Sequence, residues 1–137
     1  MALYTVKASL RSIGLQVKTN IRDHEFIQDE LAQYKGTDAG PNPVEFFLSG
    51  LSGCLTVSSK DYANHHTNIE VKKFEVETTG ETRFYQDGSS KIIHITVKIT
   101  AETNLNEINQ KRYIEEVIRR CTVHSSIEAA IPIDFKY

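Results

Sequence analysis

Residues 42–64 limit what this chain can fold into more strongly than any other segment. Asn42 suits a helix cap, Pro43 suits the first turn, and Glu45 stands three residues after the cap, as in a capping box. From Val44 to Val57, apolar or small residues stand on almost every side of the predicted helix. Such a helix is buried on all its faces instead of lying on a surface. A chain of 137 residues cannot easily enclose it, so we expect a second copy to complete the cover.

The segments before this helix alternate apolar and polar residues, which is typical of strands. Residues 4–10 and 13–17 predict a hairpin that turns at Arg11–Ser12, and residues 24–27 predict a weaker third strand. Residues 32–43 contain Gly and Pro at close intervals and predict a loop. The chain therefore begins with short strands.

After the long helix the pattern returns to strands. Residues 69–77 predict a strand whose alternation slips at Lys72–Lys73, which suggests a bulge. A turn at residues 86–89 then leads to a clean strand at 93–99. This pair is the best-marked hairpin of the sequence.

The last third predicts helices and a closing strand. A helix begins at Asn104 or Asn106, a short helix begins near Ser125, and residues 131–137 alternate as a final strand. The apolar stripe of the longer helix and its two expected ion pairs are Ile114, Val117, Ile118 and Cys121, then Glu115–Arg119 and Glu116–Arg120. The fold class is therefore α+β, with two antiparallel strand sets and helices between them.

Length and charge narrow the classes of function. The chain suits one domain over residues 1–137, and its formal net charge of −2 gives no general attraction to nucleic acid or an anionic membrane. No apolar run approaches the roughly 20 residues of a membrane span. The first residues alternate like a strand and lack the regions of a signal peptide, so we expect a cytoplasmic protein.

The two cysteines are the strongest chemical signal. Cys54 stands among small residues on the long helix, and Cys121 follows the basic pair Arg119–Arg120. Thiol redox chemistry needs such a pair, one thiolate to attack and one thiol to resolve. Cys121 lies near the C-terminal end of its expected helix, where the dipole disfavours an anion, so Cys54 is the better attacking group. The alternative is that both are buried fillers.

Two motifs resemble the osmotically inducible protein C and organic hydroperoxide resistance family (OsmC/Ohr). They are Gly40–Glu45 continuing to Gly53–Cys54, and Arg120-Cys121-Thr122-Val123-His124. The resemblance spans nearly the whole chain. It implies two antiparallel sheets packed around a long central buried helix, in an intertwined homodimer with sites at the subunit interface. It also implies a thiol-dependent peroxidase of oxidative stress defence that reduces organic hydroperoxides and, less well, hydrogen peroxide.

The resemblance assigns roles to particular residues. Cys54 takes the peroxide oxygen and Cys121 resolves it to a disulfide, which an external dithiol reduces; no metal, cofactor or prosthetic group is needed. An arginine after the first strand activates the thiol in this family, and Arg11 occupies that place, with Arg22 as the second choice. The family's hydroperoxide-resistance branch has a glutamate directly after Asn-Pro, where this chain has Val44.

Glu45 is the candidate for the missing carboxylate, but its position is unfavourable. It stands nine residues before Cys54, so about 180° of accumulated rotation separates the two on a straight helix. Glu45 is therefore either a site residue or only a helix cap. Apolar side chains near Cys54 would favour organic peroxides, or else form ordinary core: Phe46, Phe47, Leu51 and Leu55.

Other readings stay open. An OsmC-like protein that binds a small molecule or senses redox state without efficient turnover is the main alternative, and Val44 favours it. His124, three residues after Cys121, permits a thiol-dependent acyl transfer with an imidazole base. A metal site built from Cys54, Cys121 and His124, with His65 or His66, is the remaining possibility. His65 and His66 more naturally end the long helix.

Overall fold

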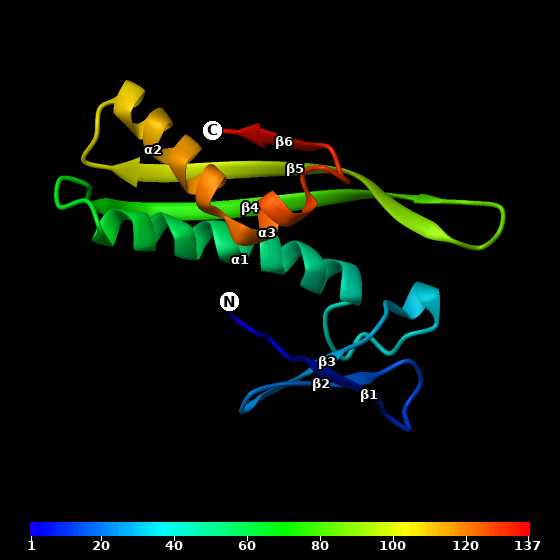
Figure 1. Cartoon of the computed structure of the whole chain (residues 1–137). Helices are drawn as coiled ribbons and strands as arrows, with labels where there is room; N and C mark the ends of the chain where they lie inside the picture. Colours follow the sequence, from blue (N-terminus) through cyan, green and yellow to red (C-terminus); the bar gives the residue numbers. More distant parts are fainter. The chain divides into compact units, whose positions relative to one another are not determined.

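A computed structural model describes all of residues 1–137, which form two compact units, residues 1–47 and residues 48–137. The ten elements come in runs of strands and runs of helices along the chain, as is typical of an α+β protein (Figure 1). Whether both units together act as the single domain expected over residues 1–137 stays a prediction.

The first unit is built on a three-stranded antiparallel sheet. Strands β1 (Lys7–Leu10), β2 (Val17–Ile21) and β3 (His24–Gln28) pair in chain order. A 3-10 turn, η1 (Ala32–Tyr34), lies in the predicted loop. The first and third predicted strands are confirmed, but the strand predicted over residues 13–17 is displaced, because it shares only Val17 with β2.

The β1–β2 connection differs from the prediction, because Ile13 and Leu15 lie in it and not in a strand. Gly14 adopts a φ of 51°, and the N–H of Gln16 donates to the Ile13 carbonyl at 3.0 Å. Glycine enters this left-handed region without steric cost. The local turn therefore overrides the alternating pattern.

The interior of the first unit is polar. Its buried residues are Gln16, Thr19 and Asp29, and none of the buried apolar side chains of the chain lies before Leu51. Apolar side chains instead stand at its surface, with Leu10 exposed by 78%. A small sheet with no buried apolar face is not stable by itself in water.

Helix α1 (Pro43–Asn64) begins as predicted. The N–H of Asn42 donates to Oε2 of Glu45 at 2.7 Å, and the N–H of Glu45 donates to Oδ1 of Asn42 at 2.9 Å. This reciprocal pair is a capping box. At the other end, Nδ1 of His65 and of His66 contact carbonyl oxygens of the last turn, at 2.8 and 2.7 Å. The two histidines therefore end the helix, as expected.

The second unit pairs two long strands and one short strand. Strands β4 (Val71–Phe84) and β5 (Ser90–Thr103) form the predicted hairpin, with the predicted irregularity between Val71 and Lys73. Helices α2 (Glu107–Arg120) and α3 (Thr122–Ile127) follow, and strand β6 (Ile133–Lys136) pairs with β5.

This second sheet corrects one detail of the prediction, because β6 runs parallel to β5 and the sheet is mixed, not wholly antiparallel. The two helices between β5 and β6 supply the long crossover that parallel neighbours need. Alternation within a strand carries no information about the direction of its neighbour.

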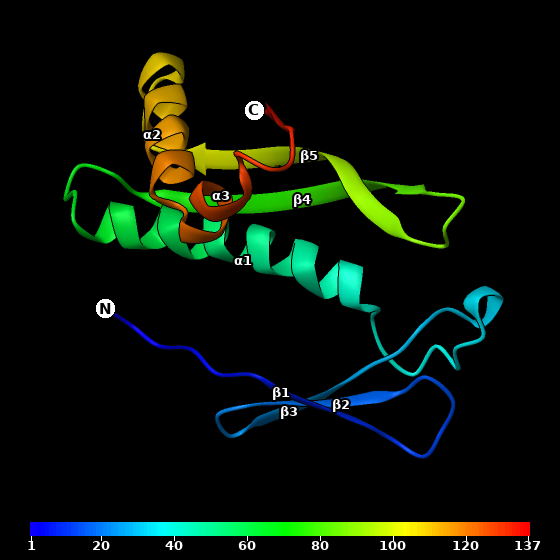
Figure 2. The ribbon, with the colours of Figure 1, turned by 45° about the vertical axis from the view of Figure 1, so that its right-hand side comes forward.

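The core of the second unit lies between the helices and one face of the sheet, and Figures 1 and 2 show α1 running alongside β4. The buried side chains come from α1, β5, α2 and the α2–α3 junction: Leu51, Leu55, Ile95, Val97, Ile99, Tyr113, Ile114, Val117 and Cys121. Gly80 of β4 admits this packing, because a Cβ there would stand 3.1 Å from the Leu48 side chain.

The opposite face of α1 is uncovered within one chain. Val57 is 70% exposed, Phe47 is also exposed, and a Cβ built at Gly50 or Gly53 would meet nothing within 4 Å. The predicted burial on every face is therefore not reached by a single copy. The small residues leave room for close approach of another backbone.

Candidate functional site

Cys54 stands on α1, at the edge of the core. Its side chain is half-buried and packs against the cluster that contains Cys121. Both cysteines are free thiols. A half-buried thiol keeps a path to small molecules in solvent while one side of it contacts apolar groups.

Cys121 is fully buried and joins two helices. It ends α2 and caps α3, and its sulfur accepts the N–H of His124 at 3.5 Å. Cys121 therefore lies at the C-terminal end of α2, as predicted, whereas the next helix begins at Thr122 and not near Ser125. The chain turns at Cys121, whose φ and ψ of −71° and 111° are not helical.

The two sulfurs interact. Burial raises the pKa of the Cys121 thiol, and contact with the Cys54 sulfur raises it too; the N–H groups of His124 and Val123 offset part of this, and the pKa is about 11. Cys121 therefore keeps its proton at neutral pH, and the two thiols, far apart in sequence, lie near each other. Cys121 suits the resolving role better than the attacking one.

The basic residues beside Cys121 are engaged elsewhere. Oε2 of Glu116 lies 2.7 Å from Nη2 of Arg119 and 3.7 Å from Nε of Arg120. The Arg120 guanidinium also lies 4.8 Å from the centre of the Tyr62 ring. Glu115 instead accepts from the Tyr137 hydroxyl at 3.4 Å, so the expected Glu115–Arg119 pair is wrong. Glu116 reaches both arginines because positions three and four apart share a helix face.

Arg11 lies at the exposed start of the β1–β2 connection in the first unit. Its guanidinium donates to Oε1 of Gln16, and its backbone N–H donates to the Gln16 carbonyl at 2.9 Å. Gln16 in turn donates to Thr37 Oγ1 at 2.7 Å, and that hydroxyl donates to Asp29 Oδ2 at 2.6 Å. Arg11 is thus held by a chain of polar contacts that ends at a buried carboxylate.

Asp29 anchors this chain of contacts. The Thr37 hydroxyl and the N–H groups of Ala39, Glu30 and Thr37 donate to its carboxylate and lower its pKa to about 2. Sequence reasoning missed Gln16, Thr37 and Asp29, because nothing in their spacing marks them as partners. Arg22, the second candidate, stands in the β2–β3 turn with a φ of 53°.

The apolar candidates divide between core and surface. Leu51 and Leu55 are fully buried core residues, Phe46 stacks on Phe26 with ring centres 4.8 Å apart, and Phe47 is exposed. Leu51 and Leu55 are therefore ordinary core within the chain. Glu45 uses its Oε2 in the capping box described above.

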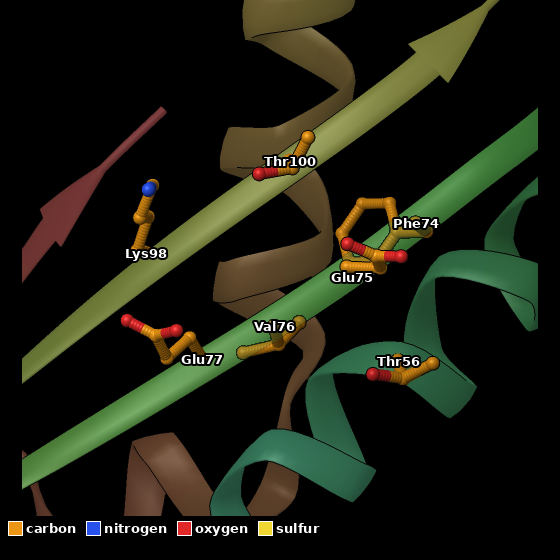
Figure 3. A pocket seen from close by; sticks show the side chains of 7 residues that line it. All are labelled: Thr56, Phe74, Glu75, Val76, Glu77, Lys98 and Thr100. Carbon is orange, nitrogen blue, oxygen red and sulfur yellow. The ribbon is translucent and has the colours of Figure 1, made fainter.

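Two hollows lie in the second unit, and neither is lined by a cysteine. The larger, of about 500 Å³, is bordered by Glu75 and Glu77 of β4 and by Lys98 and Thr100 of β5, with Thr56 of α1 beside it (Figure 3). The smaller, of about 290 Å³, lies between α1 and α2 near Tyr62 and Arg112. The structure thus places the thiol pair apart from both.

The alternatives with a metal gain no support. No group of three or more His, Cys, Asp or Glu side chains stands in an arrangement that could hold a metal ion.

None of the helices combines the length and the apolar character that crossing a bilayer requires.

A sequence model of OsmC-like proteins matches residues 36–136, which include both cysteines and the capping box. The chain belongs to the OsmC family. No curated protein matches its sequence.

Solved structures agree with this fold. The chain matches the OsmC-like protein of Mycoplasma pneumoniae with 20% identity and a TM-score of 0.87, over 98% of this chain and 95% of that one. It matches the organic hydroperoxide resistance protein OsmC of Legionella pneumophila with 15% identity and a TM-score of 0.77, over 98% of this chain and 97% of that one. It matches OhrB, the organic hydroperoxide resistance protein of Bacillus subtilis, with 17% identity and a TM-score of 0.73, over 98% of this chain and 97% of that one. At these identities the matches establish the OsmC fold alone.

Proposed function

We propose that this OsmC-family protein is a thiol-dependent peroxidase that reduces organic hydroperoxides. The observation that carries the proposal is the contact between the half-buried Cys54 and the fully buried Cys121, both reduced. Two similar proteins, from Legionella pneumophila and Bacillus subtilis, are named organic hydroperoxide resistance proteins. A reactive cysteine pair is the chemistry that such a function needs.

The reaction divides into one oxidation, one condensation and one reduction. The Cys54 thiolate attacks the distal peroxide oxygen, the O–O bond breaks, and the alcohol leaves after taking a proton; Cys54 becomes a sulfenic acid. The Cys121 sulfur then attacks the Cys54 sulfur, the S–O bond breaks, and water leaves as the disulfide forms. An external dithiol reduces the disulfide and is itself oxidised.

The environments of the two sulfurs support this order. A peroxide reaches the half-buried Cys54 more easily than the buried Cys121. The sulfur of Cys54 is among the causes that raise the pKa of Cys121. Once Cys54 is a neutral sulfenic acid, that cause is removed, and Cys121 ionises more readily at the step that needs it.

We assign Arg11 as the cation of the site and Arg22 as the second candidate. The contacts from Gln16 through Thr37 to Asp29 favour Arg11, because they limit the positions of its guanidinium. A held guanidinium stabilises a thiolate and costs less entropy to place than a free one. We also assign Glu45 as the carboxylate of the site, although its Oε2 already accepts the Asn42 N–H in the capping box.

We also propose that the functional form is a homodimer. Two apolar surfaces of the single chain lack cover: the sheet of the first unit and the α1 face that carries Val57. Exposed apolar surface of this kind marks an interaction site. A second copy supplies matching surfaces by symmetry.

The competing candidate is an OsmC-like protein that binds a small molecule or senses redox state without efficient turnover. The capping box favours it, because Glu45 is committed to Asn42 and Val44 occupies the neighbouring position. The two candidates share the thiol pair and differ in turnover.

The deciding experiment follows consumption of cumene hydroperoxide by the whole protein in the presence of excess dithiol. We expect many turnovers per protein, loss of turnover in Cys54→Ser, and a slowed cycle in Cys121→Ser. Hydrogen peroxide should be a poorer substrate. Single-turnover oxidation that then stops would favour the sensor, and unchanged turnover in Cys54→Ser would rule out the mechanism.

A further inference from the structure

The smaller hollow of the second unit has no part in the proposed cycle. It is bordered by the end of α1, by the loop that follows and by one face of α2. Its volume of about 290 Å³ is near the lower limit for small-molecule sites. No cysteine lines it, so a ligand in it would bind apart from both sulfurs.

The aromatic wall of this hollow is held in place by several contacts. The Tyr62 ring stacks on the His66 ring with centres 4.0 Å apart, and it lies 5.9 Å from the Tyr113 ring. The hydroxyl of Tyr113, which is buried, donates to the Ser59 carbonyl of α1 at 2.8 Å. A wall that is already ordered offers apolar surface to a ligand at little entropic cost.

The loop at the rim of the hollow is also fixed. Nδ2 of Asn104 donates to the Asn68 carbonyl at 2.9 Å, and Oδ1 of Asn104 accepts from the N–H of Glu70 at 2.9 Å. These two bonds join the loop after α1 to the residues that precede α2. The two sides of the hollow are therefore tied to each other.

Several polar side chains line the hollow without a partner in the chain. None of the hydrogen bonds or ion pairs of the chain engages the guanidinium of Arg112 or the side-chain amides of Asn68 and Asn109. Nδ1 of His66 contacts the Tyr62 carbonyl at 2.7 Å. Because a carbonyl only accepts hydrogen bonds, Nε2 is the His66 nitrogen that stays free for a ligand.

The charge around the hollow suits an anion. Glu116 also borders it, and the hydrogen bond from Arg119 lowers the pKa of that carboxyl, which is therefore ionised. Its Oε2 is engaged by Arg119 at 2.7 Å and by Arg120 at 3.7 Å. One carboxylate thus stands against three guanidinium groups, and Arg112 is the one that remains for a ligand. This balance favours an acid over a base.

We propose that this hollow binds a small aromatic carboxylic acid. The planar guanidinium of Arg112 matches the two carboxylate oxygens. Asn109, three residues earlier on the same helix face, supplies an amide donor beside it. The ring of the acid lies on the apolar side of the hollow, which is formed by Tyr62, Ile69 and Leu105.

Calorimetric titration of the whole protein with benzoate tests this proposal. Acetate carries the charge without the ring, benzamide carries the ring without the charge, and phenyl phosphate replaces the carboxylate by another oxyanion. We expect benzoate to bind on the order of 10-fold more tightly than acetate or benzamide. Acetate or benzamide binding as tightly as benzoate would overturn the proposal, and tighter binding of phenyl phosphate would overturn the choice of a carboxylate.

Arg112→Gln is the deciding variant, because the exposed Arg112 side chain makes no hydrogen bond or ion pair that the fold needs. Its affinity for benzoate should fall on the order of 10-fold. Lys111→Gln is the matched control, since it removes the same charge from the neighbouring position of α2, outside the hollow, and should keep the native affinity.

Three results would disprove the site. They are native affinity in Arg112→Gln, an equal loss of affinity in both variants, and no binding of benzoate by the native protein at about 10 mM, where even a weak site would be partly filled.

Discussion

The chemistry depends on two residues with opposite environments. Cys54 reaches solvent, whereas Cys121 is buried and carries a raised pKa of about 11. A thiol with that pKa is a poor nucleophile toward a peroxide at neutral pH. In the proposed mechanism this difference favours Cys54 as the attacking thiol and Cys121 as the resolving thiol, without reference to the order of the cysteines in the chain.

This difference predicts an alkaline titration of Cys121. Thiolate ultraviolet absorbance of the native protein minus that of Cys121→Ser should show one group that titrates near pH 11. Because the folded pKa is raised, the unfolding free energy should fall as pH rises from about 9 toward 11, and less so in Cys121→Ser. A Cys121 titration below pH 9 would contradict the assigned environment.

Sequence reasoning at this scale found the cysteines but not their surroundings. The motifs marked Cys54 and Cys121, and the resemblance marked Arg11. The ring of His124 on α3 contacts the ring of Phe135 on β6, eleven positions later, and the Arg11 contacts depend on Asp29 and Thr37. Polar partners brought together by tertiary structure leave no local pattern to detect.

At the scale of elements, the segment between β3 and α1 is organised by one carboxylate. Asp29 accepts from N–H groups of Glu30, Thr37 and Ala39, and so holds the strand end and the loop together. The same carboxylate ends the chain of contacts that reaches Arg11 through Gln16. Peroxidase activity and the order of this loop should therefore change together.

Asp29→Asn should lower both the thermal midpoint and the activity. Because the pKa of Asp29 falls to about 2 on folding, its contribution to stability is present above about pH 4 and is lost as pH falls toward 2. Acid titration by circular dichroism should show this loss in the native protein and not in the variant. Asn20→Asp, at an exposed strand pair with Glu25, is a control for a surface charge change. Equal acid stability of the native protein and Asp29→Asn would refute this role.

The elements themselves were mostly predictable, for local reasons. The capping box fixed the start of α1, and alternation fixed the β4–β5 hairpin and its bulge. The direction of β6 was not predictable, because it depends on the crossover through α2 and α3. The break between α2 and α3 was expected, but its position at Cys121 was not, because the apolar stripe of α2 continues to that residue.

At the scale of the whole molecule, the single chain leaves apolar surface uncovered. Val57 on α1 and Leu10 on β1 are strongly exposed, and the first unit buries no apolar side chain. The sequence indicated this through a helix that is apolar or small on nearly every side. A second copy is the cover that we propose.

Val57→Arg should therefore halve the mass measured by sedimentation and lower the stability of the protein. A charge at a buried interface position is costly, because it must be desolvated without a partner. Val57→Ala is the matched control and should keep the dimer. A native protein that sediments as a monomer at micromolar concentration would refute the proposed dimer.

The central claim is that the two sulfurs form one redox unit, and its most direct test is a mass measurement. The reduced protein is treated with one equivalent of cumene hydroperoxide, digested without reductant, and analysed for the peptide that joins Cys54 to Cys121. The account predicts that this cross-linked peptide becomes the main product and disappears on addition of a dithiol. Two free thiols after treatment, or a stable sulfenic acid on Cys54 with Cys121 still reduced, would contradict it.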